Sequence, residues 1–200
     1  MMKKYKNIIF DMGEVLLSYD WIDAIVQAGE PREEAEKLGP KLFDDPLWKQ
    51  LDLGARPYFD VVEDLIKNNP GHEESIRRYF TNVEVMPKGR PAVWKEVKKV
   101  KDKGYKLFVL SNYSEYMFSI HTHDKPFISW MDGMMISYMI HVNKPDHRIY
   151  EALLEKYELN PAECLFFDDR KENVDGAIAC GIDAIEVTSE EFLINELRKL

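Results

Sequence analysis

Four short apolar runs, set far apart along the chain, constrain the fold of this sequence most strongly. They are NIIF at 7–10, KLFVL at 106–110, CLFF at 164–167 and DAIEV at 183–187. Short continuous apolar runs are typical of parallel strands that are buried on both faces. Parallel strands need long crossover connections, which are usually helices. The runs therefore predict a parallel sheet with helices between its strands.

Helical patterns separate the later apolar runs. They cover residues 91–104, 144–157, 172–181 and 188–200. Gly104 and Gly181 stand where helices commonly end, and Thr188 with Glu191 has the spacing of a capping box at the start of the last helix. Strands that alternate with helices predict an α/β fold, a Rossmann-like doubly wound parallel sheet.

The stretch from 18 to 88 has a different character, because it contains no convincing strand. Four segments in it have helical patterns, namely 21–29, 32–43, 56–68 and 73–80. We therefore expect a core domain made of residues 1–17 and 89–200, with an α-helical cap domain of residues 18–88 inserted after the first strand. Aromatic side chains of this insert either line a substrate pocket or form its core: Tyr19, Trp21, Trp48 and Tyr58.

Composition restricts the class of partner. The chain has 200 residues and a net charge of −9, and such a charge disfavours nucleic acid and anionic membranes as partners. No apolar run approaches the ~20 residues of a membrane helix, and the start MMKKYKNIIFDMG is too short in apolar residues for a signal peptide. Cys164 and Cys180, the only cysteines, favour reduced thiols and a cytoplasmic location. We expect a monomer or a homodimer.

Polar side chains follow three of the four predicted strands. Asp11 ends the first, Ser111 and Asn112 end the second, and Asp168 and Asp169 end the third. Ligands of parallel α/β sheets bind at the carboxyl ends of the strands. If the three strands are neighbours, these side chains converge on one crevice.

Three carboxylates in one crevice would repel one another, and a divalent cation relieves that repulsion. Oxygen ligands alone suit Mg²⁺, which keeps several waters and holds phosphate. Lys144, just before a predicted helix, supplies a further positive charge. A nucleophile, a metal, a cation and small hydrogen-bond donors together favour phosphoryl transfer.

Four motifs carry a resemblance to a known family. FDMGEVL at 10–16, VLSN at 109–112, NKPDHRIYEALL at 143–154 and LFFDDRKENVDGA at 165–177 occur in this order. In these motifs the chain resembles the haloacid dehalogenase-like (HAD) hydrolases, in the group with a helical cap after the first motif. The resemblance covers nearly the whole chain, and the third and fourth motifs are its most specific parts.

The resemblance implies a role for each matching residue. Asp11 would be the nucleophile that forms an aspartyl-phosphate. Ser111 and Asn112 would bind the phosphoryl oxygens, and Lys144 would neutralise the nucleophile and the phosphate. Arg170 stays open between a phosphate contact and a place in solvent.

The resemblance also implies a Mg²⁺ site. Asp169 would be a direct ligand and Asp168 its close neighbour. Asp11 would add a carboxylate oxygen and Gly13 a backbone carbonyl oxygen. Asn173 would support the site from the first turn of its helix.

Gly13 departs from the commonest pattern of the family. Most phosphatase members carry there a second Asp that acts as acid and base, although a subset of sugar-phosphatase-like members also carries Gly. The lost acid–base catalysis is worth typically ~10²–10⁴ in rate. Either Glu14 replaces it, or the substrate has an easy leaving group such as an anomeric sugar hydroxyl. We expect Gly13 itself to allow a sharp backbone bend.

Three functions are compatible with these observations. The first is a Mg²⁺-dependent phosphatase of a small phosphorylated metabolite, with sugar phosphates as one class. The second is a 2-haloacid dehalogenase, which needs no metal, but the pair Asp168–Asp169 is not expected there. The third is a catalytically weak protein that binds a phosphorylated ligand or a protein partner, for which Asp11 would have no use.

Overall fold

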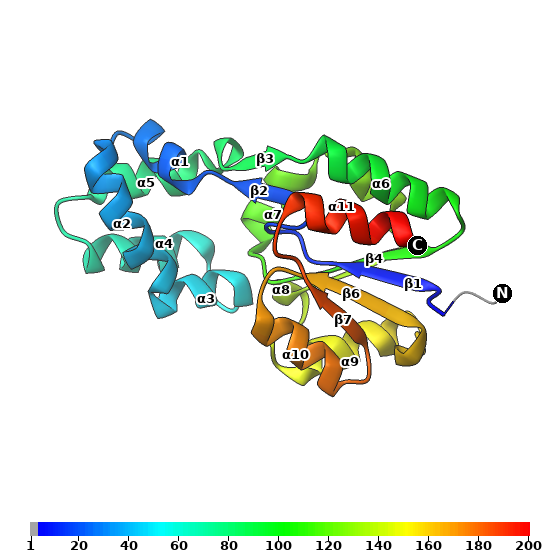
Figure 1. The fold of residues 1–200 in the computed structure, drawn as a ribbon. Helices are drawn as coiled ribbons and strands as arrows, with labels where there is room; N and C mark the ends of the chain where they lie inside the picture. Colours follow the sequence, from blue (N-terminus) through cyan, green and yellow to red (C-terminus); the bar gives the residue numbers. More distant parts are fainter. Residues whose placement is uncertain (1–3) are drawn as a thin grey trace.

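The computed structural model describes residues 4–200, so residues 1–3 of the expected core domain lie outside it (Figure 1). Its main sheet has five parallel strands in the order β5-β4-β1-β6-β7. These are β1 (Asn7–Phe10), β4 (Lys106–Ser111), β5 (Gly133–Ile136), β6 (Cys164–Asp168) and β7 (Asp183–Glu186). All four predicted strands are confirmed, and β5 adds an edge that the sequence analysis missed.

Helices cover both faces of this sheet, as the doubly wound prediction requires (Figure 1). On one face α6 (Pro91–Asp102) packs beside α11 (Glu190–Lys199), and on the other lie α9 (His147–Lys156) and α10 (Lys171–Ala179). The capping box predicted from Thr188 is wrong by one residue. The Ser189 side chain caps α11 by accepting a hydrogen bond from the Phe192 N–H at 3.1 Å.

The side chains of β1 alternate between two apolar cores. Ile8 and Phe10 belong to the larger cluster, and Ile9 belongs to the smaller one, which includes Ile149 and Leu153 of α9. All three β1 residues have no exposed surface. Because successive side chains of a strand point to opposite faces, an apolar run with no polar alternation requires a helix layer on each side.

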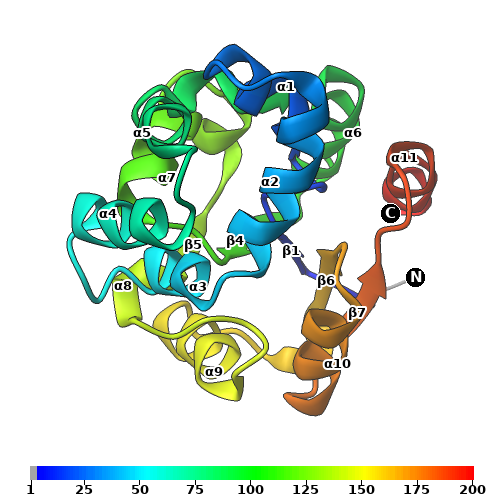
Figure 2. The same cartoon turned by 90° about the vertical axis from the view of Figure 1, so that its left-hand side faces the viewer.

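Helices α1 to α5 form a second lobe, which Figure 2 views from the front, with the sheet behind it. They are α1 (Trp21–Gln27), α2 (Arg32–Asp44), α3 (Pro46–Leu53), α4 (Tyr58–Asn68) and α5 (Glu73–Thr81). Four were predicted and α3 was missed. Its start carries a local signal, because the Asp45 side chain caps the Leu47 N–H and Pro46 occupies the first turn.

A short two-stranded ribbon joins the two lobes. β2 (Leu17–Tyr19) pairs antiparallel with β3 (Pro87–Gly89), so the interpretation that 18–88 contains no strand was wrong at both ends. Three-residue strands carry no readable periodicity, and these two pair because the chain leaves and returns at one place. The remaining short elements are η1 (Val83–Val85), α7 (Glu115–Thr122), η2 (Pro126–Trp130), α8 (Ser137–Ile140) and η3 (Pro161–Glu163). In the described part of the chain, no helix has the length and apolar character to cross a membrane.

Candidate active site

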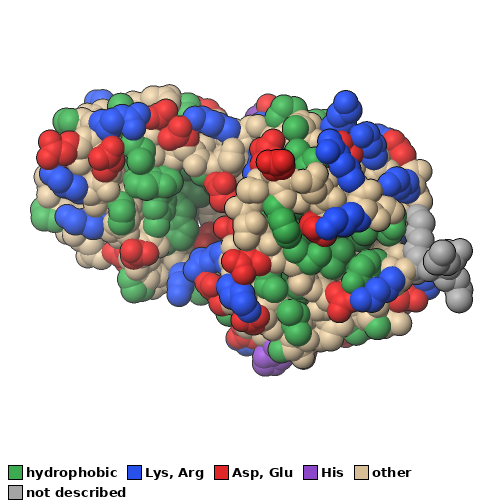
Figure 3. Space-filling view, in the orientation of Figure 1, with side chains coloured by type: hydrophobic (Ala, Val, Ile, Leu, Met, Phe, Trp, Pro, Cys, Tyr) green, Lys and Arg blue, Asp and Glu red, His purple; other side chains and the backbone are tan. Residues whose placement is uncertain are grey.

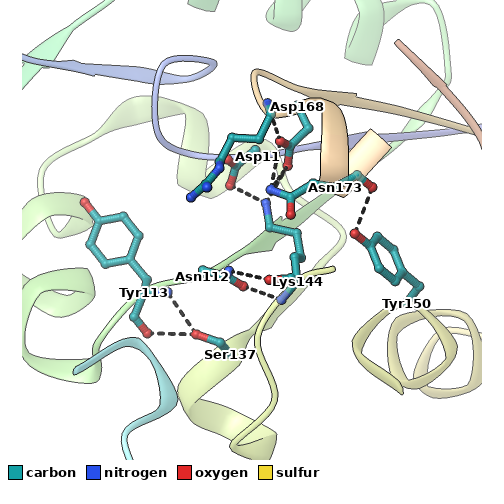
Figure 4. Close-up of polar contacts among 9 residues, drawn as sticks. Asp11, Asn112, Tyr113, Ser137, Lys144, Tyr150, Asp168 and Asn173 are labelled. Carbon is teal, nitrogen blue, oxygen red and sulfur yellow. Dashed lines mark hydrogen bonds and ion pairs between the residues drawn. The ribbon is translucent and has the colours of Figure 1, made fainter. Parts of the chain in front are cut away.

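The carboxyl ends of β4, β1 and β6 lie side by side at the edge of the sheet that faces the helical lobe (Figure 1). Asp11 follows β1 directly, while Ser111 and Asp168 are the last residues of β4 and β6. These strands are adjacent in the sheet, so the predicted convergence is confirmed (Figure 4). One carboxylate oxygen from each of Asp11, Asp168 and Asp169 lies within 4.8 Å of the others.

Lys144 is the cation of this cluster. Its Nζ lies 2.8 Å from Asp11 Oδ1 and 2.6 Å from Asp168 Oδ2, and only 1% of its side chain is exposed. Burial by itself would lower the pKa of Lys144, but the two carboxylates outweigh burial and raise it. The site therefore holds a buried ammonium that remains charged between two acidic groups.

Asp168 is held from several sides. Besides Lys144, it accepts hydrogen bonds from the Arg170 backbone N–H at 2.9 Å and from Asn173 Nδ2 at 3.0 Å. Asn173 is fixed in turn, because the Tyr150 hydroxyl donates to its backbone carbonyl at 2.8 Å (Figure 4). The side-chain amide of Asn173 thus orients Asp168, and the support that Asn173 would give to a metal site stays a prediction.

The other two carboxylates are less well compensated. Burial raises the pKa of Asp169 to about 7, with added contributions from the charges of Asp11 and Asp168. Burial also raises the pKa of Asp11, although Lys144 acts in the opposite direction. The ammonium of Lys144, 2.8 Å from Asp11 Oδ1, is shared with Asp168, so one positive charge faces three acidic side chains. A cluster of carboxylate oxygens with excess negative charge fits a divalent cation such as Mg²⁺.

Asn112 and Ser111 have partners in the structure. The Asn112 Nδ2 donates to the Lys144 backbone carbonyl at 3.0 Å, and the Lys144 N–H donates to Asn112 Oδ1 at 2.7 Å. A hydrogen bond from the Ser111 hydroxyl partly opposes the rise that burial causes in the pKa of Asp11. The contacts that both residues would make with a phosphoryl group stay predictions, and Asn112 has gained a positioning role.

The expected sharp bend at Gly13 was wrong, because the left-handed residue of this loop is Glu14, with φ +51°. A Cβ at Gly13 would lie 3.4 Å from Cε2 of Tyr19, which is ordinary van der Waals contact, so the space around residue 13 does not by itself require glycine.

Glu14 and Arg170, two candidates from the sequence, already have partners. The Glu14 carboxylate accepts a hydrogen bond from the Tyr19 backbone N–H at 2.9 Å. The Arg170 guanidinium is 61% exposed and pairs with Glu172. Their proposed contacts with a substrate stay predictions.

Two residues that the sequence analysis did not single out hold the loop after Asp11. Arg90 donates to the carbonyls of Glu14 and Val15, the latter at 3.2 Å. Trp94 Nε1 donates to the Leu16 carbonyl at 2.7 Å. Neither residue has a sequence signal for this role, because each contact spans more than 70 positions.

A buried hydrogen-bond chain connects the ribbon to the second motif. His121 Nε2 donates to the Val83 carbonyl at 2.7 Å, so its Nδ1 accepts from the Tyr113 hydroxyl at 2.6 Å. The Tyr113 hydroxyl also pairs with that of Tyr19. Tyr19 is therefore half-buried beside the loop after Asp11 and contributes to packing there.

The sequence profile of the haloacid dehalogenase-like hydrolases matches residues 5–181. The chain belongs to this family. The phosphatase MT3486 of Mycobacterium tuberculosis is 28% identical over 192 residues, which cover 88% of this chain and 84% of that protein. The sesquiterpene phosphatase astK of Aspergillus oryzae is 26% identical over 204 residues, covering 100% of this chain and 98% of that protein.

A solved structure of this family has the same fold. The HAD family enzyme bt-2542 of Bacteroides thetaiotaomicron, in complex with magnesium and inorganic phosphate, superposes with a TM-score of 0.71. It is 17% identical and covers 93% of this chain, which in turn covers 96% of that enzyme. The fold and motif order predicted from the sequence are therefore those of a HAD-like hydrolase.

Proposed function

We propose that this HAD-like hydrolase is a phosphatase that cleaves phosphate monoesters of small metabolites through an aspartyl-phosphate on Asp11. The observation that carries the proposal is the buried triad in which Lys144 lies between Asp11 and Asp168. A carboxylate at the carboxyl end of a parallel strand, beside a charged ammonium, is suited to attack phosphorus. The ammonium then neutralises the negative charge of the phosphoryl group. The relatives named as phosphatases support the same reaction class.

We further propose that Asp11, Asp169 and the Gly13 carbonyl hold Mg²⁺, with Asp168 and Asn173 ordering the site around them. A bound Mg²⁺ would neutralise the phosphoryl oxygens and hold them in place. The residues fit this group because their donor atoms are all oxygens and the acidic side chains outnumber the one buried lysine. The acidic pair at the end of β6 also favours this reaction over a metal-free dehalogenation.

The chain's own residues divide the remaining work. The Asp11 carboxylate attacks phosphorus, and Lys144 offsets the charge that builds up on the phosphoryl group. The Ser111 hydroxyl lies beside Asp11 and is placed to donate to a phosphoryl oxygen. Asn112 keeps the Lys144 backbone in register with the loop after β4. Water then hydrolyses the aspartyl-phosphate and releases phosphate.

Residues 18–88 act in this proposal as a cap that selects the substrate and excludes water. Figure 3 shows a hollow between this lobe and the core, with a green patch of hydrophobic side chains on the cap side. A cap over the strand ends favours small molecules over phosphoproteins. The hydrophobic patch is a reason to test phosphate esters of apolar alcohols as well as sugar phosphates. The similar protein astK is named as a sesquiterpene phosphatase, and sesquiterpenes are apolar.

The experiment is phosphate release from a panel of sugar phosphates, prenyl phosphates, nucleotides and phosphorylated cofactors, with Mg²⁺ or with EDTA. We expect release that requires Mg²⁺ and is abolished by Asp11→Asn. A matched control is Asp44→Asn, because Asp44 is an exposed carboxylate at the end of α2. Release that persists in Asp11→Asn would contradict the nucleophile, and turnover of 2-chloropropionate in EDTA would favour the dehalogenase instead.

A further inference from the structure

The end of cap helix α3 is tied to the core directly beside the active site. Three core side chains that follow β5 donate hydrogen bonds to its last carbonyls. Asn143 Nδ2 donates to Lys49 at 3.0 Å, His141 Nδ1 donates to Leu53 at 2.8 Å, and the Ser137 hydroxyl donates to Asp52. These bonds hold the backbone of Asp52 in one place relative to the core.

Ser137 links Asp52 to the catalytic loop. Its hydroxyl oxygen accepts a hydrogen bond from the Tyr113 N–H at 2.9 Å, and Tyr113 directly follows Asn112 (Figure 4). One hydroxyl thus joins the cap backbone to the loop that carries Ser111 and Asn112. The bond uses only the carbonyl of Asp52, so its carboxyl group remains available.

The carboxyl group of Asp52 lies in the electrostatic field of the catalytic cluster. Burial and the charge of Asp11 raise its pKa to about 7, while Lys144 and Arg170 act in the opposite direction. The charges of Asp52 and Asp11 both act on the buried hydroxyl of Tyr113. The Ser137 hydroxyl bonds both the Asp52 carbonyl and the Tyr113 N–H, so Asp52 lies beside the loop that carries Ser111 and Asn112.

Cleavage of an alkyl phosphate needs an acid beside the leaving oxygen. Asp168 is saturated with donors, and Lys144 is held between two carboxylates. Glu14 accepts from the Tyr19 backbone, and residue 13 has no side chain. We propose that Asp52, supplied by the cap, is the general acid and base of this site. The proposal rests on the phosphatase function proposed above.

The two steps balance as follows. As Asp11 forms its bond to phosphorus and the ester P–O bond breaks, protonated Asp52 gives its proton to the departing oxygen, and the alcohol leaves. The Asp52 carboxylate then takes a proton from the water that attacks the aspartyl-phosphate. Phosphate leaves, Asp11 is restored, and Asp52 is protonated again. A carboxyl with a pKa near neutrality is suited to both transfers.

The test compares Asp52→Asn with wild type on p-nitrophenyl phosphate and benzyl phosphate, in Mg²⁺. Nitrophenolate leaves as a stable anion, whereas the benzyl alkoxide must be protonated as it leaves. We expect kcat/KM on benzyl phosphate to fall by ~10²–10⁴. The rate at which p-nitrophenyl phosphate phosphorylates Asp11 should fall much less. This rate is measured as the burst of nitrophenolate in the first turnover. Asn keeps the shape of Asp, and the Ser137 bond uses the backbone, so the fold is expected to persist.

Two comparisons make the outcome decisive. The exposed cap residue Asp44 serves as control, and Asp44→Asn is expected to lower neither rate. Equal losses of Asp52→Asn on both esters, or no loss on either, would overturn the role of Asp52. A selective loss in Glu14→Gln in place of Asp52→Asn would assign the role to Glu14. No phosphate release by wild type from either ester or from the panel would overturn the phosphatase proposal itself.

Discussion

The side chain of Asn112 and the backbone of Lys144 form a closed pair of hydrogen bonds, at 3.0 Å and 2.7 Å. Asn112 follows β4, and Lys144 precedes α9, so this pair of hydrogen bonds links the second motif to the third. The Lys144 ammonium reaches Asp11 and Asp168 from a backbone that Asn112 holds.

Asn112→Ala tests this positioning role. Loss of two hydrogen bonds with a partly buried partner costs about 1–3 kcal/mol, so we expect kcat to fall ~10–100-fold if the loss appears at the transition state. The measurement is steady-state phosphate release with a thermal melt in parallel. A rise in KM with unchanged kcat would indicate simple substrate binding by Asn112 and would contradict the positioning role.

Lys144→Met removes the ammonium that pairs with both Asp11 and Asp168. Because the variant leaves buried carboxylates without their cation, we expect a loss of about 3–5 kcal/mol in the free energy of unfolding, measured by urea denaturation in EDTA. Lys37→Met is the control, because Lys37 pairs with glutamates on an exposed helix face, where ion pairs contribute little to stability. Equal losses in the two variants would argue against a buried charge cluster.

His121 predicts a pH dependence of stability. Burial lowers its pKa from 6.5 to about 4 in the folded protein. The unfolded chain therefore binds more protons between these values, and the free energy of unfolding should fall as the pH drops from 6.5 towards 4. The full shift corresponds to roughly 3 kcal/mol. Urea denaturation across this range should show a weaker dependence for His121→Gln, and an identical dependence in both proteins would contradict the prediction.

The hydrogen bonds from core side chains to the backbone of α3 predict that they limit the local unfolding of this helix. The double variant His141→Ala and Asn143→Ala removes two of its three side-chain bonds, each worth about 0.5–1.5 kcal/mol. We expect faster amide hydrogen exchange in α3, with exchange in β1 and β6 unchanged. Unchanged exchange in α3 would mean that packing alone holds this helix.

Local patterns in the sequence determined which strands carry the site and which polar residues follow them. Apolar runs at β1, β4 and β6 predict buried parallel strands, and the polar residues after them must then gather at one sheet edge. Asp11, Ser111 and Asp168 were found in this way, because strand direction and burial are encoded by neighbouring residues. The resemblance paired Lys144 with Asp11, whereas its second ion pair, with Asp168, was seen only in the folded chain.

Contacts between distant segments decided the rest. The backbone of Lys144 holds the side chain of Asn112, and the Ser137 hydroxyl binds the carbonyl of Asp52, 85 positions earlier in the chain. The pairing of β2 with β3 likewise depends on where the cap returns to the core. No periodic pattern or fixed spacing in the sequence predicts these contacts, because each depends on how helices and loops pack against the sheet.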